Sequence, residues 1–264
     1  MPSVIQERMG VWGERTASID WCESNYEITP WIAEFWNTIS NLAMIIPSLY
    51  GCFVVLTQGL ETRYLISYLF FLTVGIGSWM FHMTLQYSMQ LLDELPMIYT
   101  TCLFIYLQAM IKEGPGKHNK LLICCLAGYA IFFTALYSVW SNPLVMEYMY
   151  AFVIVILLGQ SVWLLYQESN PACLRVFIVG TALYAVAFLI WNIDNHFCSH
   201  LQEFRKGKST GVAALSQLHA WWHLLAGYST YLHILFSSHF RLSMLKRNPK
   251  FVICPIGLSV VTSP

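Results

Sequence analysis

The sequence predicts an all-helical membrane protein with seven transmembrane helices, and its composition and its charge-free stretches carry this prediction. Of its 264 residues 57% are hydrophobic and only 11% are charged, and the mean hydropathy is +0.55. Soluble domains carry about 25% charged residues, so this charge is too low to cover a water-soluble globule. The 14 basic residues are balanced by 14 acidic ones, which excludes a nucleic-acid-binding protein. Lipid in place of water around most of the surface explains this composition.

Seven charge-free stretches approach the roughly 20 residues that cross a bilayer as a helix. The second and last stretches exceed one span, so we expect their surplus to form loops. The short third span should begin earlier and carry Asp93 and Glu94 near its mouth. Asn142-Pro143 is a turn signal, so the fourth helix should end near Trp140. The stretches are Phe35–Leu60, Tyr64–Leu92, Leu95–Ile111, Leu121–Met146, Tyr148–Gln167, Val176–Ile193 and Ser209–Phe240.

No repeat or linker interrupts these stretches, so we expect one membrane domain. It would cover residues 34–240, with an N-terminal segment at 1–33 and a tail at 241–264. The first 30 residues are polar and mixed in charge, so no cleavable signal peptide is expected and the first span should direct insertion.

Seven spans place the two termini on opposite sides of the membrane. The side that holds the N-terminus, called here the N-terminal side, carries five basic residues, and the opposite C-terminal side carries nine. Basic residues favour the cytoplasm, so we expect a lumenal N-terminus and a cytoplasmic C-terminus. The five basic residues are Arg8, Arg15, Arg205, Lys206 and Lys208.

The cysteines agree with this orientation. Of eight cysteines, only Cys22 and Cys198 fall on the N-terminal side, and the others lie in spans or on the side where the cytosol keeps thiols reduced. Cys22 and Cys198 either pair or remain two free buried thiols, an alternative that only geometry decides.

Three histidines form a candidate metal site. His219 and His223 are spaced four apart, which puts both imidazoles on one helix face. His82 lies at the end of the second span, where the chain reaches the N-terminal side, so all three share one layer of the membrane. Three neutral imidazoles with an open fourth position are the catalytic zinc pattern. The pair His196 and His200 has the same spacing, but it crosses a membrane exit and is set aside.

Two polar residues accompany these histidines. Ser78 precedes His82 by four residues and shares its helix face, and Asp93 opens the third span from the same side. Taken one at a time, each residue has a structural alternative. A serine in a membrane helix commonly hydrogen-bonds to the backbone of its own helix, and a carboxylate at a helix start is commonly a cap. Together with the histidines, the two favour a metal-dependent active site.

An acidic cluster precedes the first span. No Lys or Arg occurs from Thr16 to Thr62, and this stretch holds Asp20, Glu23, Glu27 and Glu34 with Asn25. Oxygen ligands without a countercharge suit a hard cation such as Ca²⁺, whereas the alternative is an acidic, solvated lead-in.

Long stretches of the chain closely resemble the alkaline ceramidases. They include D-W-C-E-S-N-Y from Asp20, W-I-A-E-F-W-N-T-I-S-N-L from Trp31, G-S-W-M-F-H-M-T-L from Gly77, M-Q-L-L-D-E-L-P-M-I-Y from Met89, F-L-I-W-N-I-D-N from Phe188 and Q-L-H-A-W-W-H from Gln217. More distantly, the serine, histidine and aspartate set is similar to the adiponectin-receptor-like seven-helix hydrolases.

The resemblance implies hydrolysis of ceramides, including phytoceramide and dihydroceramide, to sphingoid base and fatty acid. It implies an alkaline optimum, calcium stimulation, and a place in endoplasmic reticulum and Golgi membranes. It also implies a Cys22–Cys198 disulfide and a role for Tyr150 at the reacting carbonyl oxygen. By the resemblance, zinc is held by His82, His219 and His223, and calcium by Asp20, the Trp21 carbonyl, Glu23, Asn25 and Glu34.

The expected mechanism is metal-assisted amide hydrolysis. A bound zinc ion lowers the pKa of water from 15.7 to about 7. Asp93 would take the proton of this water and pass it to the leaving amine, and Ser78 and Tyr150 would donate hydrogen bonds to the oxyanion. The alternative is a seven-helix lipid receptor in which a structural zinc joins the second and seventh helices. No protein partner is inferred, and the lipid substrate would enter from the bilayer.

Overall fold

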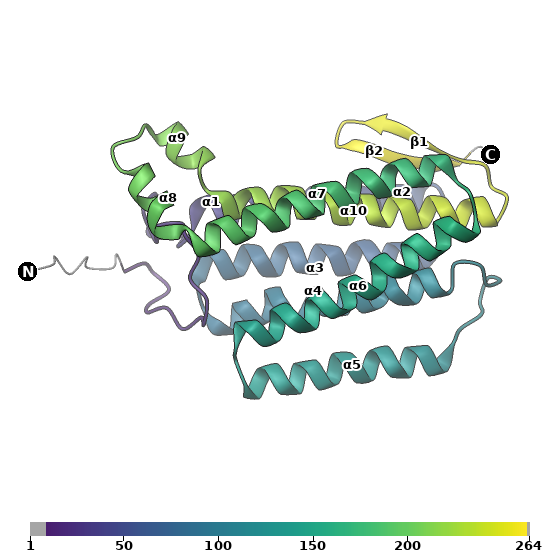
Figure 1. Ribbon diagram of the computed structural model, residues 1–264, viewed down its shortest axis with the longest axis horizontal. Coiled ribbons are helices and arrows are strands. Elements are labelled where there is room, and N and C mark those ends of the chain that lie inside the picture. Colours follow the sequence, from purple (N-terminus) through teal and green to yellow (C-terminus); the bar gives the residue numbers. More distant parts are fainter. Residues whose placement is uncertain (1–8, 263–264) are drawn as a thin grey trace, which may run out of the picture.

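The computed structural model describes residues 9–262, so Arg8 lies outside the described residues. Within them the chain forms seven long helical units in one bundle (Figure 1). The units are α1 with α2 (Phe35–Ser40 and Leu42–Thr57), α3 (Thr62–Thr84), α4 (Tyr87–Ala109), α5 (Lys120–Val139), α6 (Pro143–Gln167), α7 (Pro171–His196) and α10 (Leu218–Met244). The prediction of a predominantly helical chain is therefore confirmed.

Within residues 9–262, five of these units are long and apolar enough to cross a membrane, namely all except α4 and α10. These two helices carry polar side chains, including Asp93 and Glu94 on α4 and His219 and His223 on α10. Both helices pack inside the bundle: α10 contacts α7 and α2, and α4 contacts α3 and α6. Their polar residues thus face other helices, as polar groups in membrane helices normally do.

The helix boundaries correct one sequence prediction. Of the surplus in the second stretch, only Leu85 and Gln86 form a turn, and Tyr87–Leu92 already belongs to α4. Leu85 takes a left-handed conformation with φ of 50°, which lets α3 turn sharply into α4. Asp93 consequently lies in the second turn of α4 and not at its mouth. The predicted end of the fourth helix is confirmed, since α5 ends at Val139 and Trp140 caps it.

The segment before α1 packs against the turn between α3 and α4. The backbone N–H groups of Thr16 and Ala17 donate to the carbonyl of Leu85 at 3.2 and 3.1 Å. The N–H of Glu34 donates to the carbonyl of His82 at 3.0 Å. Two short helices, α8 (Cys198–Arg205) and α9 (Thr210–Leu215), lie at the same end of the bundle (Figure 1). This end is therefore covered by the segment before α1 and by the two short helices between α7 and α10.

The opposite end is held by a buried arginine. Arg241, 1% exposed, donates from Nε to Glu61 Oε2 at 2.8 Å and from Nη2 to Glu61 Oε1 at 3.0 Å. Its Nη1 donates to the carbonyls of Ile111 and Glu113 at 2.9 and 2.5 Å. One side chain thus joins the end of α10 to the start of α3 and to the segment after α4.

A β-hairpin follows α10. Strands β1 (Pro249–Cys254) and β2 (Gly257–Thr262) pair antiparallel, with Pro249 opposite Thr262. The hairpin runs along the bundle near the end that holds Arg241 (Figure 1). Tyr231 of α10 donates from its hydroxyl to the carbonyl of Leu258 at 2.8 Å. The described hairpin residues after α10 are therefore folded against the helices.

Candidate metal centre

Three buried histidines meet at the end of the bundle that carries the N-terminal segment. His82 comes from the last turn of α3, and His219 and His223 come from the first two turns of α10. One ring nitrogen of each lies within 4.8 Å of the other two, and the side chains are 1%, 3% and 4% exposed. The predicted convergence of these three residues is thus present in the structure. His196 and His200, which were set aside, lie exposed at the end of α7 and in α8.

The outer nitrogens of two of the rings are hydrogen-bonded. His82 Nδ1 lies 2.5 Å from Glu34 Oε2. His223 Nδ1 lies 2.8 Å from Ser40 Oγ and 3.1 Å from the carbonyl of Asn37. These partners fix each ring and direct its Nε2 toward the other histidines, as carboxylates and carbonyls do for histidines that bind metals.

Two inner nitrogens are left without a partner. Among the described residues, His82 Nε2 and His219 Nδ1 are buried and make no hydrogen bond. Buried polar atoms are nearly always paired, so two unpaired nitrogens within one group of three histidines call for a bound group. Three imidazoles are the donor set that Zn²⁺ accepts, and they leave a fourth position for water or substrate. The residues present therefore fit a zinc ion.

The N-terminus of α10 is positioned by Asp194, at the end of α7. Its carboxylate lies close to the backbone N–H groups of Leu218 and His219 and of Cys22. A carboxylate is favoured at a helix start because the first N–H groups lack partners within the helix. Asp194 fixes the turn that presents His219, and the sequence analysis did not identify this role. Its only signal was an acidic residue directly after the charge-free stretch Val176–Ile193.

Ser78 and Asp93 lie together beside the histidines. Ser78 is 2% exposed, lies one turn before His82, and hydrogen-bonds through its hydroxyl to the Asp93 carboxylate. The contact depends on a close approach of α3 and α4 at Gly77. A Cβ atom added to Gly77 would lie 2.1 Å from the carbonyl oxygen of Leu92. The missing side chain at Gly77 therefore lets α4 bring Asp93 to Ser78.

Tyr150 lies on α6 and bonds elsewhere. Its hydroxyl hydrogen-bonds with Tyr184 and Thr101. The Tyr184 ring in turn contacts the Trp222 ring, with 5.6 Å between centroids. Trp222 precedes His223, so this chain of contacts ends at the metal-site helix. In the described part of the chain no direct contact joins Tyr150 to the three histidines, and its role at the carbonyl oxygen stays a prediction.

The acidic cluster lies next to the histidines. Glu34 is fully buried and accepts from the backbone N–H of Trp21 at 3.0 Å and from Asn37 Nδ2 at 3.3 Å. Glu23 accepts from the backbone N–H groups of Trp36 and Asn37 at 2.7 and 2.8 Å and so caps α1. The two carboxylates therefore hold the N-terminal segment against the start of the first helix.

The charges of this cluster are poorly balanced. Burial raises the pKa of Glu23 to about 8, the Glu34 charge adds to the rise, and its two backbone hydrogen bonds oppose it. Burial and then the charge of Asp20 raise the pKa of Glu34 well above its usual range. In addition, Asn25 Oδ1 is buried and has no partner among the described residues. A divalent cation would relieve the repulsion and pair this oxygen, so the residues fit Ca²⁺.

Asp20 and Glu27 have other partners. Asp20 accepts from Asn25 Nδ2 at 3.1 Å and pairs with Arg15 at 3.4 Å on the surface. Glu27 acts electrostatically on Arg205.

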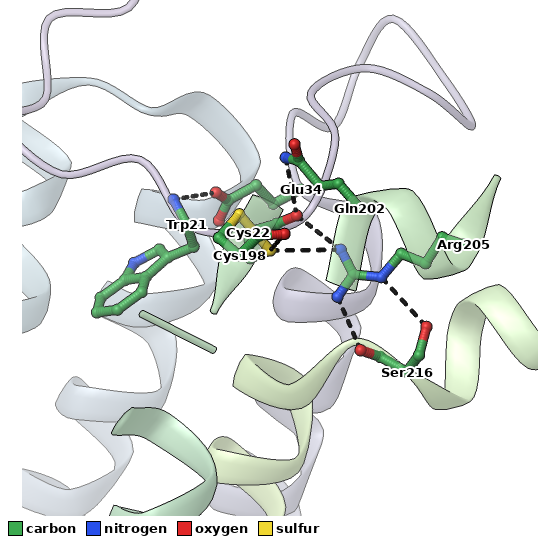
Figure 2. The surroundings of a disulfide bond; sticks show 7 residues. All are labelled: Trp21, Cys22, Glu34, Cys198, Gln202, Arg205 and Ser216. Carbon is green, nitrogen blue, oxygen red and sulfur yellow. Dashed lines mark hydrogen bonds between the residues drawn. A yellow bond between two sulfur atoms is a disulfide. The ribbon is translucent and has the colours of Figure 1, made fainter. Parts of the chain in front are cut away.

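A disulfide joins Cys22 to Cys198, with 5.2 Å between their Cα atoms, as the resemblance implied. Figure 2 shows how Arg205 supports it: Nη1 donates to the Cys22 carbonyl at 2.7 Å and Nη2 to the Ser216 carbonyl at 2.7 Å. Cys22 is thereby tied to α8 and to the segment that leads into α10.

Trp21 connects the two candidate ion sites. Its ring stacks on the His219 ring, with 3.8 Å between centroids and 21° between planes. Its backbone N–H binds Glu34, which also binds His82 (Figure 2 shows the Trp21–Glu34 bond). The order of the N-terminal segment and the orientation of two of the three histidines are therefore physically linked.

Comparisons with known proteins agree with this geometry. A family model described as Ceramidase matches residues 13–258. The chain is 42% identical to alkaline ceramidase 3 of Mus musculus over 244 residues, which covers 92% of this chain and 91% of the mouse protein. It is 35% identical to alkaline ceramidase YPC1 of Saccharomyces cerevisiae, covering 89% and 80%, and 30% identical to an alkaline ceramidase of Drosophila melanogaster, covering 85% and 77%.

Proposed function

Because the chain belongs to the ceramidase family, we propose that its three-histidine centre hydrolyses the amide bond of ceramides. Membership makes the chain a ceramidase and favours an enzyme over a receptor. The observation that carries the zinc assignment is the buried trio His82, His219 and His223 with unpaired inner nitrogens. The products are a sphingoid base and a fatty acid, and phytoceramide and dihydroceramide are included among the proposed substrates.

The chemistry is divided between a metal and the side chains around it. A zinc ion bound by the three histidines would supply a Lewis acid and a water of lowered pKa. Asp93 takes a proton from the attacking water and gives one to the leaving nitrogen, so that one water is consumed for each amide cleaved. Ser78 would hold the Asp93 carboxylate in place through its hydrogen bond.

The oxyanion that develops on the substrate carbonyl needs donors. Ser78 and Tyr150 each carry a hydroxyl that can donate. Removal of one pre-positioned donor to an oxyanion typically lowers the rate of turnover by about 10²–10³-fold. Ser78 lies one turn before His82, and its single hydroxyl proton would have to turn from the Asp93 carboxylate to the oxyanion when substrate binds. Tyr150 is proposed for this role on the resemblance alone, and its bonds with Tyr184 and Thr101 would have to rearrange when substrate binds.

Calcium is proposed to act through structure. Its ligands would be Asp20, the Trp21 carbonyl, Glu23, Asn25 and Glu34, around the unpaired oxygen of Asn25 and the closely spaced carboxylates. Glu34 and Trp21 also contact His82 and His219, so an ordered N-terminal segment would hold these rings in place. Calcium would therefore stimulate turnover without touching the substrate.

The proposed topology has seven spans, with α4 and α10 as the two inner, more polar ones. The termini of the described chain lie at opposite ends of the bundle, which an odd number of spans requires (Figure 1). The excess of basic residues at the Arg241 end supports a cytoplasmic C-terminus and a lumenal metal centre. The proposed membranes are those of the endoplasmic reticulum and Golgi apparatus, and the proposed optimum is alkaline.

The function is tested with purified full-length protein in detergent micelles and a ceramide with a labelled acyl chain. Release of labelled fatty acid is expected, together with one zinc per chain by elemental analysis. A zinc chelator should abolish release, and added zinc should restore it. Release that is unaffected by complete removal of zinc would refute the metal-dependent mechanism, whereas absence of release from ceramides of all types would refute the substrate class.

A further inference from the structure

Two adjacent cysteines on α5 differ from the other free cysteines of the chain. Six cysteines lie outside the disulfide, and all of them are among the described residues. Cys102 and Cys173 are buried, and Cys52 and Cys254 are partly buried. Cys124 and Cys125 are both exposed. On a membrane-spanning helix an exposed side chain faces the bilayer or its surface, and cysteines near the end of such a helix are typical sites of S-acylation.

Their position lies just inside the predicted membrane boundary. The helix begins at Lys120, and Asn119 caps it by accepting from the N–H of Leu122 at 3.0 Å. At 1.5 Å per residue, the two thiols lie about 6 to 8 Å along the helix from Lys120. Thiols at this depth lie near the level of the lipid headgroups, within reach of both the cytosol and the acyl region.

The turn before these cysteines is cationic. Lys117, His118 and Lys120 are exposed and line an open pocket of about 620 Å³ between the end of α4 and the start of α5. Lys117 pairs with Glu113 at 3.4 Å, which leaves this turn with a net positive charge. Such a turn attracts phosphate-bearing molecules at the membrane surface.

The surface one turn deeper leaves space for a hydrocarbon chain. Ala127 and Gly128 follow Cys124 by three and four residues, and both are exposed. A Cβ atom added to Gly128 would meet nothing within 4 Å. The helix itself lies at the edge of the bundle (Figure 1) and buries only Phe133 and Tyr137 fully. An attached chain can therefore lie along α5 toward the bilayer centre without displacing another side chain.

From this arrangement we propose that Cys124 and Cys125 are S-acylated by long-chain acyl thioesters of a phosphate-bearing carrier such as coenzyme A. The cysteine thiolate attacks the thioester carbonyl, a new carbon–sulfur bond forms, and the carrier leaves as a thiol that takes up the proton. No oxidant or reductant is needed. The inference rests on the cytoplasmic orientation proposed above for this end of the bundle, because the carriers and their transferases face the cytosol.

The test uses the full-length chain expressed in eukaryotic cells. Free thiols are blocked, thioesters are cleaved with hydroxylamine, and the released thiols are tagged with a polyethylene glycol maleimide that shifts the band on a gel. Wild type should show two hydroxylamine-dependent shifts, Cys124→Ser and Cys125→Ser one shift each, and the double variant none. Cys102→Ser, a change at a buried thiol of α4, is the matched control and should behave as wild type.

Ceramide turnover separates this inference from the proposed function. The double variant should keep wild-type turnover, because neither cysteine belongs to the metal centre. A wild type that hydrolyses ceramide but shows no hydroxylamine-dependent shift would overturn the acylation proposal and leave the function intact. Unchanged shifts in the double variant would overturn it as well.

Discussion

Glu34 Oε2 lies 2.5 Å from His82 Nδ1, and this contact joins the first residue before α1 to the last turn of α3. The same carboxylate receives the backbone N–H of Trp21 on its other oxygen. Glu34 therefore belongs to both candidate ion sites at once. A carboxylate behind a metal-binding histidine fixes the ring and raises its basicity, and changes at such positions typically cost 10–100-fold in metal affinity or activity.

The first prediction concerns the three histidines. His82→Ala, His219→Ala and His223→Ala should each lose bound zinc and all measurable ceramide hydrolysis, because two imidazoles rarely hold a catalytic zinc ion. Zinc content and fatty acid release are measured on the purified variants. His200→Ala, an exposed histidine of α8, serves as the control and should match wild type. A histidine whose variant keeps both properties does not bind the metal.

Asp93 is expected to move protons and not to hold the metal. Asp93→Asn should keep zinc and lower turnover by about 10²–10⁴-fold, since an amide cannot accept the proton of water. Glu94→Gln is the neighbouring control, because Glu94 is bonded instead to Tyr137 and Gln90. A near wild-type rate for Asp93→Asn would assign the base to another group.

Glu34 should show a coupled defect. Glu34→Gly removes the contacts to Trp21 and to His82 and adds a glycine at a helix start, which costs less than the roughly 1 kcal/mol of a helix interior. We expect a lower melting temperature, weaker calcium dependence and low activity even with zinc bound. Glu34→Gln separates charge from shape, because the amide keeps an oxygen acceptor but loses the negative charge.

Melting temperature and ceramide turnover are measured across a calcium titration for wild type and both Glu34 variants. Responses identical to wild type would show that Glu34 is not a calcium ligand. A wild type indifferent to calcium would remove the calcium site altogether.

The effect of calcium on stability should grow with pH. The pKa of Glu23 is raised to about 8, chiefly by burial, compared with about 4.3 in an unfolded chain. Between these values the metal-free folded state binds more protons than the unfolded state, so its unfolding free energy falls as pH rises. Calcium balances the ionised carboxylate and removes this penalty.

Melting temperatures with calcium and with a calcium chelator should therefore differ more at about pH 9 than at about pH 6. Glu23→Gln should lose most of this pH trend, because its amide does not titrate. An equal calcium effect at both pH values in wild type would argue against a cation beside Glu23.

Gly77 is predicted to be essential although it has no chemistry of its own. In Gly77→Ala the new methyl group would lie 2.1 Å from the Leu92 carbonyl oxygen and push α4 away from α3. Overpacking of this kind costs about 1–3 kcal/mol, and the Ser78–Asp93 contact should be lost. Turnover should fall far more than zinc content. Gly128→Ala, which meets open space on α5, is the matched control.

The main features of the metal centre followed from the sequence because they depend on spacing. His219 and His223 share a helix face, and the count of spans placed His82 at the same depth. The partners Glu34 and Ser40 of two rings, and the place of Asp194 at the His219 backbone, did not follow from the sequence, because they depend on tertiary contacts between distant elements. The turn at Leu85 was also missed, since a left-handed leucine has no signal in the sequence. The sequence therefore predicts one span followed by a loop over Tyr64–Leu92, whereas the chain turns at Leu85 and continues as α4.

The position of the last long helix has a consequence for biogenesis. α10 supplies two of the three histidines at one end and the buried Arg241 at the other. A nascent chain that has not yet released residues 218–244 from the ribosome holds only one histidine of the metal group and leaves Glu61 without its arginine partner. Metal binding at the proposed three-histidine centre would therefore follow the synthesis of α10, and a quality-control step that senses this metal would report on completion of the whole bundle.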